Sequence, residues 1–141
     1  MKMKIVLALA LAAILIGANG LRAQYNHNDV DLQEQYRVLN HDFFGDHLPA
    51  NTSVQWRNIP MEHGRYVLGA TTENPNDGSF TIVIDTKTNV AFSTEEVTLL
   101  HEMCHVATYD YAVTHGQDVH GPAFQACLEE LYVNGAYKDL L

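Results

Sequence analysis

Basic residues are scarce in this chain of 141 residues, which has 8 Lys and Arg against 17 Asp and Glu. Nucleic-acid phosphates are bound by clustered basic side chains, so this charge balance argues against a nucleic-acid partner and against an anionic membrane surface. Internal repeats and low-complexity stretches are also lacking, which excludes a solenoid and a disordered tail. With 47% hydrophobic residues, the chain is long enough for one globular domain and too short for two.

Long hydrophobic runs are lacking too, apart from one at the start of the sequence. Residues 5–18 are apolar and follow Lys2 and Lys4, and a small residue, Ala23, comes shortly afterwards. This layout is typical of a secretory signal peptide spanning residues 1–23. A retained membrane anchor is the alternative, but the run is shorter than the ~20 residues that a membrane span needs. We therefore expect a secreted or periplasmic protein that begins at Gln24 and has no stable membrane association after cleavage.

Cleavage at this point would make the protein more acidic. The signal segment contains three basic residues and no acidic one, so 5 basic and 17 acidic residues remain and the net charge becomes −12. The expected partner is accordingly a protein or peptide and not a nucleic acid. The sequence does not indicate the oligomeric state.

The rest of the chain, residues 24–141, is predicted to form one α+β domain. Asp31, with Glu34 three residues later, predicts the start of a first helix that ends near Phe44 and Gly45. Three short strands are then expected, within residues 54–56, 65–71 and 80–85. Residues 74–78 read Asn-Pro-Asn-Asp-Gly, a strong turn sequence, so the last two strands should pair antiparallel in a small, mainly antiparallel sheet.

Two further helices complete the predicted domain. A capping box at Ser93–Glu96 opens a helix expected to span residues 94–110, and its apolar residues lie on more than one side. Such a helix should be central and buried on most faces. Pro122 suits the first position of a last helix, which Asn134 and Gly135 should end.

The central helix carries a His-Glu-x-x-His motif. His101 and His105 are four residues apart, so both project from one helical face and can hold one metal ion. Glu102 lies on the neighbouring flank, where its carboxylate can reach a metal-bound water without being a ligand. Zinc lowers the pKa of that water, and Glu102 can take its proton as the water attacks a carbonyl.

A catalytic zinc needs a third protein ligand and an open fourth position. The longer metzincin motif is absent, because Thr108 and Tyr111 occupy its Gly and third His positions. The remaining candidates are His120, His115, Glu129 and Glu130. We favour His120, because it lies where the loop meets the last helix, whereas His115 lies in the middle of the loop.

Several segments together resemble the SprT-like zinc metalloprotease domain family, which includes the Spartan proteases. The resemblance covers nearly all of the chain after the signal segment and rests on Leu39–Pro49, Trp56, Gly64-Arg65, Gly69, Ile82–Ile84, His101–His105 and the His-Gly-Pro-x-Phe motif at His120–Phe124. It implies a minimal zincin-like fold with Zn²⁺ held by His101, His105 and His120, and with Glu102 as the catalytic base. Many members act on DNA-linked proteins through basic segments, which this acidic chain lacks, so that substrate is not expected to carry over.

Five further residues have two readings each. Cys104 and Cys127 are the only cysteines, and a disulfide is allowed in an exported protein, but we expect two free core residues. Tyr109 and Tyr111 follow the motif and are candidates to stabilise an oxyanion, although packing is the more common role at such positions. Similarly, Asp118 can orient a histidine ligand or simply be a solvated loop acid.

These observations predict an exported zinc-dependent endopeptidase. The strand at residues 80–85 is expected to lie at a sheet edge and to pair with an extended peptide. Two rival functions remain: a zinc-stabilised binding module with little turnover, and a zinc amidase acting on cell-wall peptides. An intact Glu102 argues against the first, because a structural zinc site has no use for a base at this position.

Overall fold

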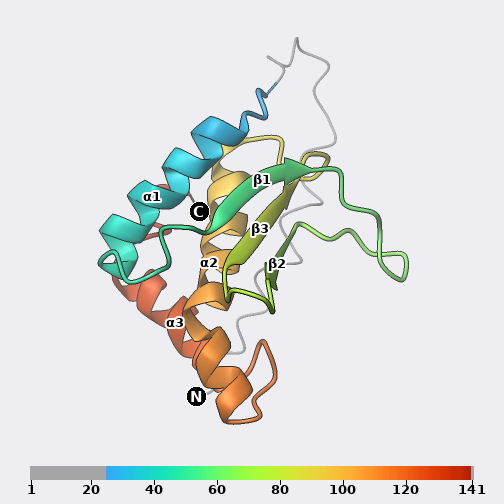
Figure 1. The fold of residues 1–141 in the computed structure, drawn as a ribbon. Coiled ribbons are helices and arrows are strands. Elements are labelled where there is room, and N and C mark those ends of the chain that lie inside the picture. Colours follow the sequence, from blue (N-terminus) through green and yellow to red (C-terminus); the bar gives the residue numbers. More distant parts are fainter. Residues whose placement is uncertain (1–24, 141) are drawn as a thin grey trace.

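The computed structural model describes residues 25–140, so the predicted signal peptide lies outside the described residues. The elements follow the order α1 (Asp29–Phe44), β1 (Ser53–Arg57), β2 (Gly69–Glu73), β3 (Phe80–Asp85), α2 (Phe92–Thr114) and α3 (Pro122–Val133). Figure 1 shows the helices gathered beside one small sheet, which is the α+β layout expected from the sequence. Among the helices of residues 25–140, none is long and apolar enough to cross a membrane.

The first helix begins two residues before the predicted start. Asn28 is its N-cap, and the Asn28 side chain accepts a hydrogen bond from the backbone N–H of Val30 at 3.0 Å. At the other end Gly45 adopts a left-handed conformation with φ of 58°, which ends the helix where the sequence predicted. One face of α1 is buried in the core through Leu32, Tyr36 and Leu39.

The sheet has the strand order β1-β3-β2. The predicted antiparallel pairing of β2 with β3 is confirmed, but β1 pairs parallel with β3, so the sheet is mixed and not mainly antiparallel. The reason lies in the connection after β1, which carries the chain to the far side of β3 before β2 begins. Part of that connection is held by the Asp85 carboxylate, which accepts a hydrogen bond from the Ile59 N–H at 2.8 Å.

This strand order corrects a second expectation. The strand at residues 80–85 was predicted to offer a free edge, but β3 is the middle strand and both of its edges are paired. The outer strands are β1 and β2. Any peptide that extends this sheet must therefore pair with one of those two.

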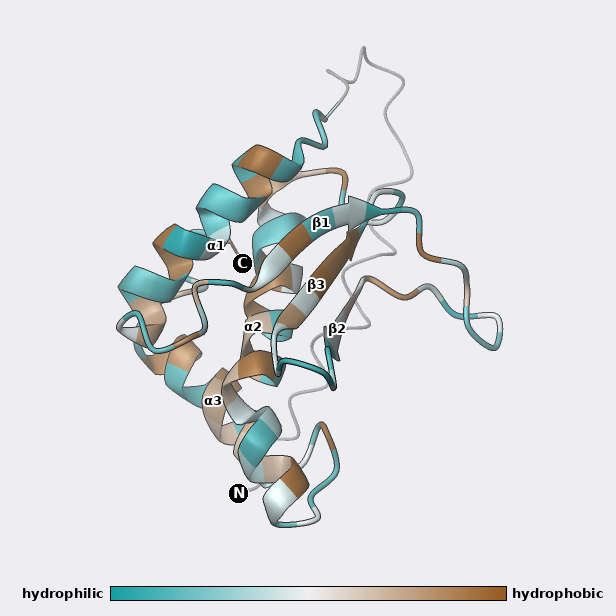
Figure 2. Cartoon of the chain, in the orientation of Figure 1, coloured by the Kyte–Doolittle hydropathy of each residue, from teal (hydrophilic) through white to brown (hydrophobic). Residues whose placement is uncertain are grey.

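The core lies between the sheet and the helices. Val54 and Trp56 of β1 and Phe80, Ile82 and Ile84 of β3 are buried in the same cluster as Leu99, Leu100 and Met103 of α2. Figure 2 shows the hydrophobic residues of β3 and α2 in this interior. α2 is central, as predicted, and all but one of its buried residues lie between Glu95 and Val106.

The N-terminus of α2 is capped two residues earlier than the Ser93–Glu96 pattern predicted. Ala91 occupies the N-cap position, and its backbone N–H donates to the Thr94 hydroxyl at 3.3 Å. The same hydroxyl donates back to the Ala91 carbonyl oxygen at 2.8 Å. α3, by contrast, begins at Pro122 and is followed by Asn134 and Gly135, as the sequence predicted.

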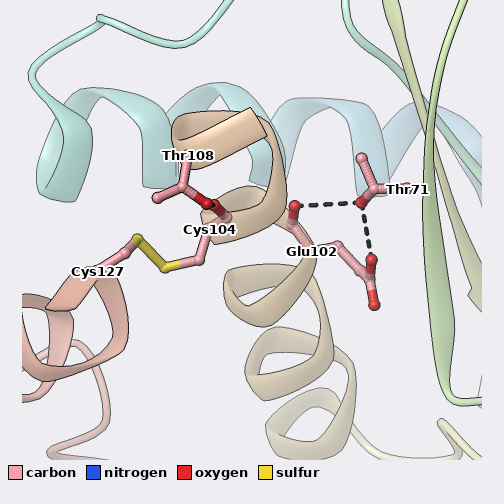
Figure 3. Close-up of a disulfide and its surroundings, with 5 residues drawn as sticks. All are labelled: Thr71, Glu102, Cys104, Thr108 and Cys127. Atoms are coloured by element: carbon pink, nitrogen blue, oxygen red, sulfur yellow. Dashed lines mark hydrogen bonds between the residues drawn. A yellow bond between two sulfur atoms is a disulfide. The ribbon is translucent and has the colours of Figure 1, made fainter. Parts of the chain in front are cut away.

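The prediction of free cysteines is wrong. Cys104 of α2 and Cys127 of α3 form a disulfide, with their Cα atoms 5.8 Å apart (Figure 3). Both residues were expected on packed helix faces, and that expectation is correct. Sequence periodicity places each cysteine on its own helix, but only the crossing of the two helices brings the sulfur atoms within bonding distance.

Candidate metal centre

His101 and His105 lie on one side of α2, one helical turn apart. Their ring centroids are 5.0 Å apart, and both side chains are half-buried. The helix itself sets this spacing, because residues i and i+4 are neighbours on a helical surface. The pair is therefore placed by local structure alone.

His120 comes to this pair from the turn that precedes α3. Its ring centroid lies 5.5 Å from that of His101 and 4.8 Å from that of His105. One ring nitrogen from each of the three histidines can be chosen so that all lie within 4.8 Å of one another. The structure thus assembles the three histidines that the sequence singled out, from two elements separated by a loop.

The other candidates for a third ligand lie elsewhere. The His115 ring stacks on Tyr111 with centroids 3.9 Å apart, and its Nδ1 lies 2.9 Å from the Tyr111 carbonyl oxygen. Glu129 and Glu130 are exposed on α3, and among the described residues they are not part of the histidine group. Geometry therefore favours His120, as the sequence analysis did, while metal ligation itself stays a prediction.

The turn that carries His120 is fixed by Asp118. The Asp118 carboxylate accepts a hydrogen bond from the His120 backbone N–H at 2.9 Å, and the Asp118 carbonyl oxygen accepts one from Gly121 N–H at 2.8 Å. A Cβ atom at Gly121 would lie 2.7 Å from that carbonyl oxygen, so only glycine fits without a shift of the backbone. Asp118 thus holds the backbone of His120, and none of the hydrogen bonds within residues 25–140 joins its carboxylate to the His120 ring.

Phe124 forms the floor of the histidine group. Its ring stacks on His105 at 4.4 Å, with an interplanar angle of 25°, and meets the rings of His101 and His120 nearly edge-on, each at 4.9 Å. Phe124 is only 2% exposed, so its position is set by the core. The sequence analysis named Phe124 as the last residue of the His-Gly-Pro-x-Phe motif and did not predict its contact with the histidines.

Burial makes the two helical histidines poor bases. The pKa of His101 is lowered to about 4, first by loss of solvation and then by positive charge on His105 and His120. The pKa of His105 is also lowered to about 4, first by burial and then by His120. Both imidazoles are therefore neutral near pH 7, the state in which a ring nitrogen can bind a metal ion.

The donor set suits a divalent zinc ion in number and kind. Three neutral imidazoles are a known ligand set of catalytic Zn²⁺, which keeps a fourth position for water or substrate. The rings are held from one side by Phe124, and they reach the group from two elements. His101, His105 and His120 are thus the residues that would hold the metal.

Glu102 follows the first histidine and turns toward the sheet. It is 4% exposed, and its Oε2 accepts a hydrogen bond from the Thr71 hydroxyl of β2 at 2.7 Å (Figure 3). Burial raises the pKa of Glu102 to about 7, while the Thr71 hydrogen bond opposes this rise. A carboxyl group with a pKa near neutrality can accept and return a proton, as general acid–base catalysis requires.

Tyr109 and Tyr111 have other partners in this structure. Tyr109 packs edge-on against Phe80 with centroids 5.4 Å apart, and a hydrogen bond to Glu73 raises the pKa of Tyr109. Tyr111 stacks on His115. An oxyanion-stabilising role for either tyrosine stays a prediction without support from these contacts.

A histidine pair and a glutamate on a central helix, with a third histidine before the next helix and a small sheet alongside, form the layout of a zincin-like, metallopeptidase-type domain. Comparison with protein families points the same way, because residues 32–138 match the SprT-like family. The chain belongs to that family, as its motifs suggested. No solved structure matches it.

Proposed function

We propose that this chain is an exported zinc-dependent endopeptidase that hydrolyses peptide bonds in proteins or peptides. One observation carries the proposal: three imidazoles converge on α2, and the residue after His101 on that helix, Glu102, is a buried carboxylate hydrogen-bonded to Thr71 of β2. This combination supplies a metal site and a base next to an outer strand of the sheet. A purely structural zinc site would need the histidines but not the glutamate.

Zinc bound by the three histidines would lower the pKa of a water molecule and polarise the carbonyl of the peptide. Glu102 then acts as the base, accepting a proton from the attacking water and passing it to the nitrogen of the leaving amine. Helix α2 carries His101 and His105, and Phe124 of α3 packs against both rings. The arrangement of these side chains is therefore in place before the substrate arrives.

The outer edge of β2 is the favoured place for an extended substrate. In an antiparallel pair, residues alternate between hydrogen bonding to the neighbouring strand and pointing their backbone groups away from it. Asp85 N–H donates to Leu68 O at 2.9 Å and Asn74 N–H donates to Ser79 O at 2.7 Å, so the even-numbered residues face β3. The backbone groups of Gly69, Thr71 and Glu73 therefore face the free edge, where a peptide strand can pair with them.

Export is supported by the N-terminal sequence and by the cysteines. A disulfide suits an oxidising compartment, where Cys104 and Cys127 would stay paired. The strongly acidic chain also favours a peptide substrate over nucleic acid. We therefore propose a mature protein that begins at Gln24 and acts in the periplasm or outside the cell.

The test is hydrolysis of casein by the purified mature protein, with metal content measured in the same sample. We expect about one zinc per chain, loss of cleavage with a chelator and recovery on adding zinc. Glu102→Gln should keep zinc while its rate falls by at least about 10²–10⁴-fold, because the base is lost. Glu130→Gln, at an exposed position on α3, is the matched control and should cleave like wild type.

The rivals give different results in this experiment. A binding module would hold zinc and cleave nothing, and an amidase would release fragments from cell-wall peptides but leave casein intact. Equal rates for wild type and Glu102→Gln would contradict the proposed mechanism.

A further inference from the structure

The Thr71 hydroxyl makes two contacts with Glu102. It lies 2.7 Å from the carboxylate Oε2 and 3.2 Å from the backbone carbonyl oxygen of the same residue. Figure 3 shows both contacts, with Thr71 reaching from β2 to the helix that bears Glu102. One hydroxyl therefore connects the sheet edge to both the side chain and the backbone of the proposed base.

This contact matters because the carboxylate is buried. Among the hydrogen bonds within residues 25–140, the Thr71 hydroxyl is the donor that reaches the Glu102 side chain. A buried carboxylate without a hydrogen-bond donor destabilises the folded protein. Without the Thr71 hydroxyl, the Glu102 side chain is therefore expected to rotate to another orientation. Burial alone keeps Glu102 inside the protein, whereas the hydroxyl selects the direction in which its oxygen points.

Gly69 restricts Glu102 from a second side. A Cβ atom at Gly69 would lie 3.0 Å from both Cγ and Oε1 of Glu102, and 3.0 Å from the Thr98 methyl carbon Cγ2. These distances are shorter than ordinary van der Waals contacts. Gly69 and Thr71 are two residues apart in β2, so both present the same face to α2. The carboxylate is thus enclosed by a glycine on one side and a hydroxyl on the other.

We propose that Thr71 is a positioning residue for Glu102, and that Gly69 provides the space this position needs. The inference rests on the proposed function and goes beyond it by linking the base to the substrate edge. Thr71 has its backbone groups at the free edge of β2 and its hydroxyl on Glu102. A peptide paired with β2 would be held by the same residue that orients the base.

The contact is tested first in the metal-free protein, without any substrate. A double-mutant cycle combines Thr71→Val with Glu102→Ala, and unfolding is measured in urea at pH 8. Thr71→Val should raise the unfolding equilibrium constant about tenfold when Glu102 is present and less than threefold when it is absent. Thr72→Val is the matched control on the exposed face of the same strand and should show no such dependence on Glu102.

The positioning role is then tested with the zinc-loaded protein and casein peptides. Thr71→Val should lower kcat about 10- to 100-fold with KM changed less than threefold, because substrate pairing uses the unchanged backbone. Thr71→Ser restores the hydroxyl and should recover kcat to within about threefold of wild type. Gly69→Ala should lower kcat as well, with zinc content unchanged.

The two tests separate this inference from the proposed function. Absence of coupling between residues 71 and 102, or a Thr71→Val enzyme as fast as wild type, overturns the positioning role. A wild-type protein that cleaves nothing contradicts the proposed function alone, and the coupling measured in the metal-free protein still decides whether Thr71 orients Glu102. If Thr71→Val does not fold, Thr71→Ser and Thr71→Ala provide the same comparison, because these two variants differ from each other by one hydroxyl group.

Discussion

Cys104, the residue before His105, is joined by a disulfide to Cys127 of α3, seven residues after His120. The bond links the helix that presents two of the proposed ligands to the helix that follows the third. It lies beside the contact of Phe124 with His105, in which the rings stack at 4.4 Å. The disulfide therefore holds together the two elements that form the histidine group.

Thiol titration checks this bond directly. The unfolded but unreduced protein should contain no free thiol, and its mass should be lower than that of the reduced form by two hydrogen atoms. Replacing both cysteines with alanine should lower the free energy of unfolding by about 3 kcal/mol, because the bond closes a loop with a sequence separation of 23 residues. Two titratable thiols in protein purified without a reducing agent would contradict the structure at this point.

The choice between His120 and His115 is tested by metal binding. His120→Ala should lower zinc affinity by at least about 100-fold, since changes outside the ligand set alone cost 10- to 100-fold. His115→Ala is the matched control, because His115 contacts Tyr111 instead of the histidine group. Zinc content after dialysis, measured by atomic absorption, distinguishes them. The reverse result, with zinc lost only from the His115 variant, would show that the assignment of His120 is wrong.

Zinc affinity is expected to fall when a single methyl group is added at Gly121. Gly121→Ala would place a Cβ 2.7 Å from the Asp118 carbonyl oxygen and so displace the turn that carries His120. We expect zinc affinity to fall roughly tenfold, a loss typical of changes that disturb the support of a ligand. Isothermal titration with zinc measures it, with Ala126→Ser at an exposed position on α3 as the control. Unchanged affinity would mean that the turn adapts without moving His120.

The stability of the fold should depend on pH through Glu95. Burial and the nearby charge of Glu96 raise the pKa of Glu95 to about 7 in the folded protein, whereas the unfolded chain titrates near the ordinary value of 4.5. The folded state therefore binds the proton more tightly. The stability gained from the protonated form is fully present below about pH 4.5 and is lost as the pH rises through 7.

Glu95→Gln removes this titration. Relative to wild type, the variant should gain about 1–2 kcal/mol of stability between pH 5 and pH 8, measured by urea unfolding at both values. The exposed Glu130→Gln should show no such change. Parallel stability curves for wild type and Glu95→Gln would show that the raised pKa of Glu95 does not affect folding.

Local patterns in the sequence predict those parts of this protein that neighbouring residues define. The i, i+4 spacing of His101 and His105 follows from helical geometry, and the Asn-Pro-Asn-Asp-Gly turn predicts the antiparallel pairing of β2 with β3. The end of α1 at Gly45 and the start of α3 at Pro122 are likewise local signals. Such features depend on backbone preferences and on contacts within a few residues.

The remaining features are decided by packing between distant segments. The parallel pairing of β1, the central place of β3 and the disulfide depend on how elements cross in three dimensions, which periodicity does not encode. The contact of Thr71 with Glu102 joins residues 31 positions apart, and a threonine in a short strand gives no signal of such a role. The residues proposed to bear the chemistry can thus be recognised from their spacing, while the residues that hold them in place emerge only when the chain is folded.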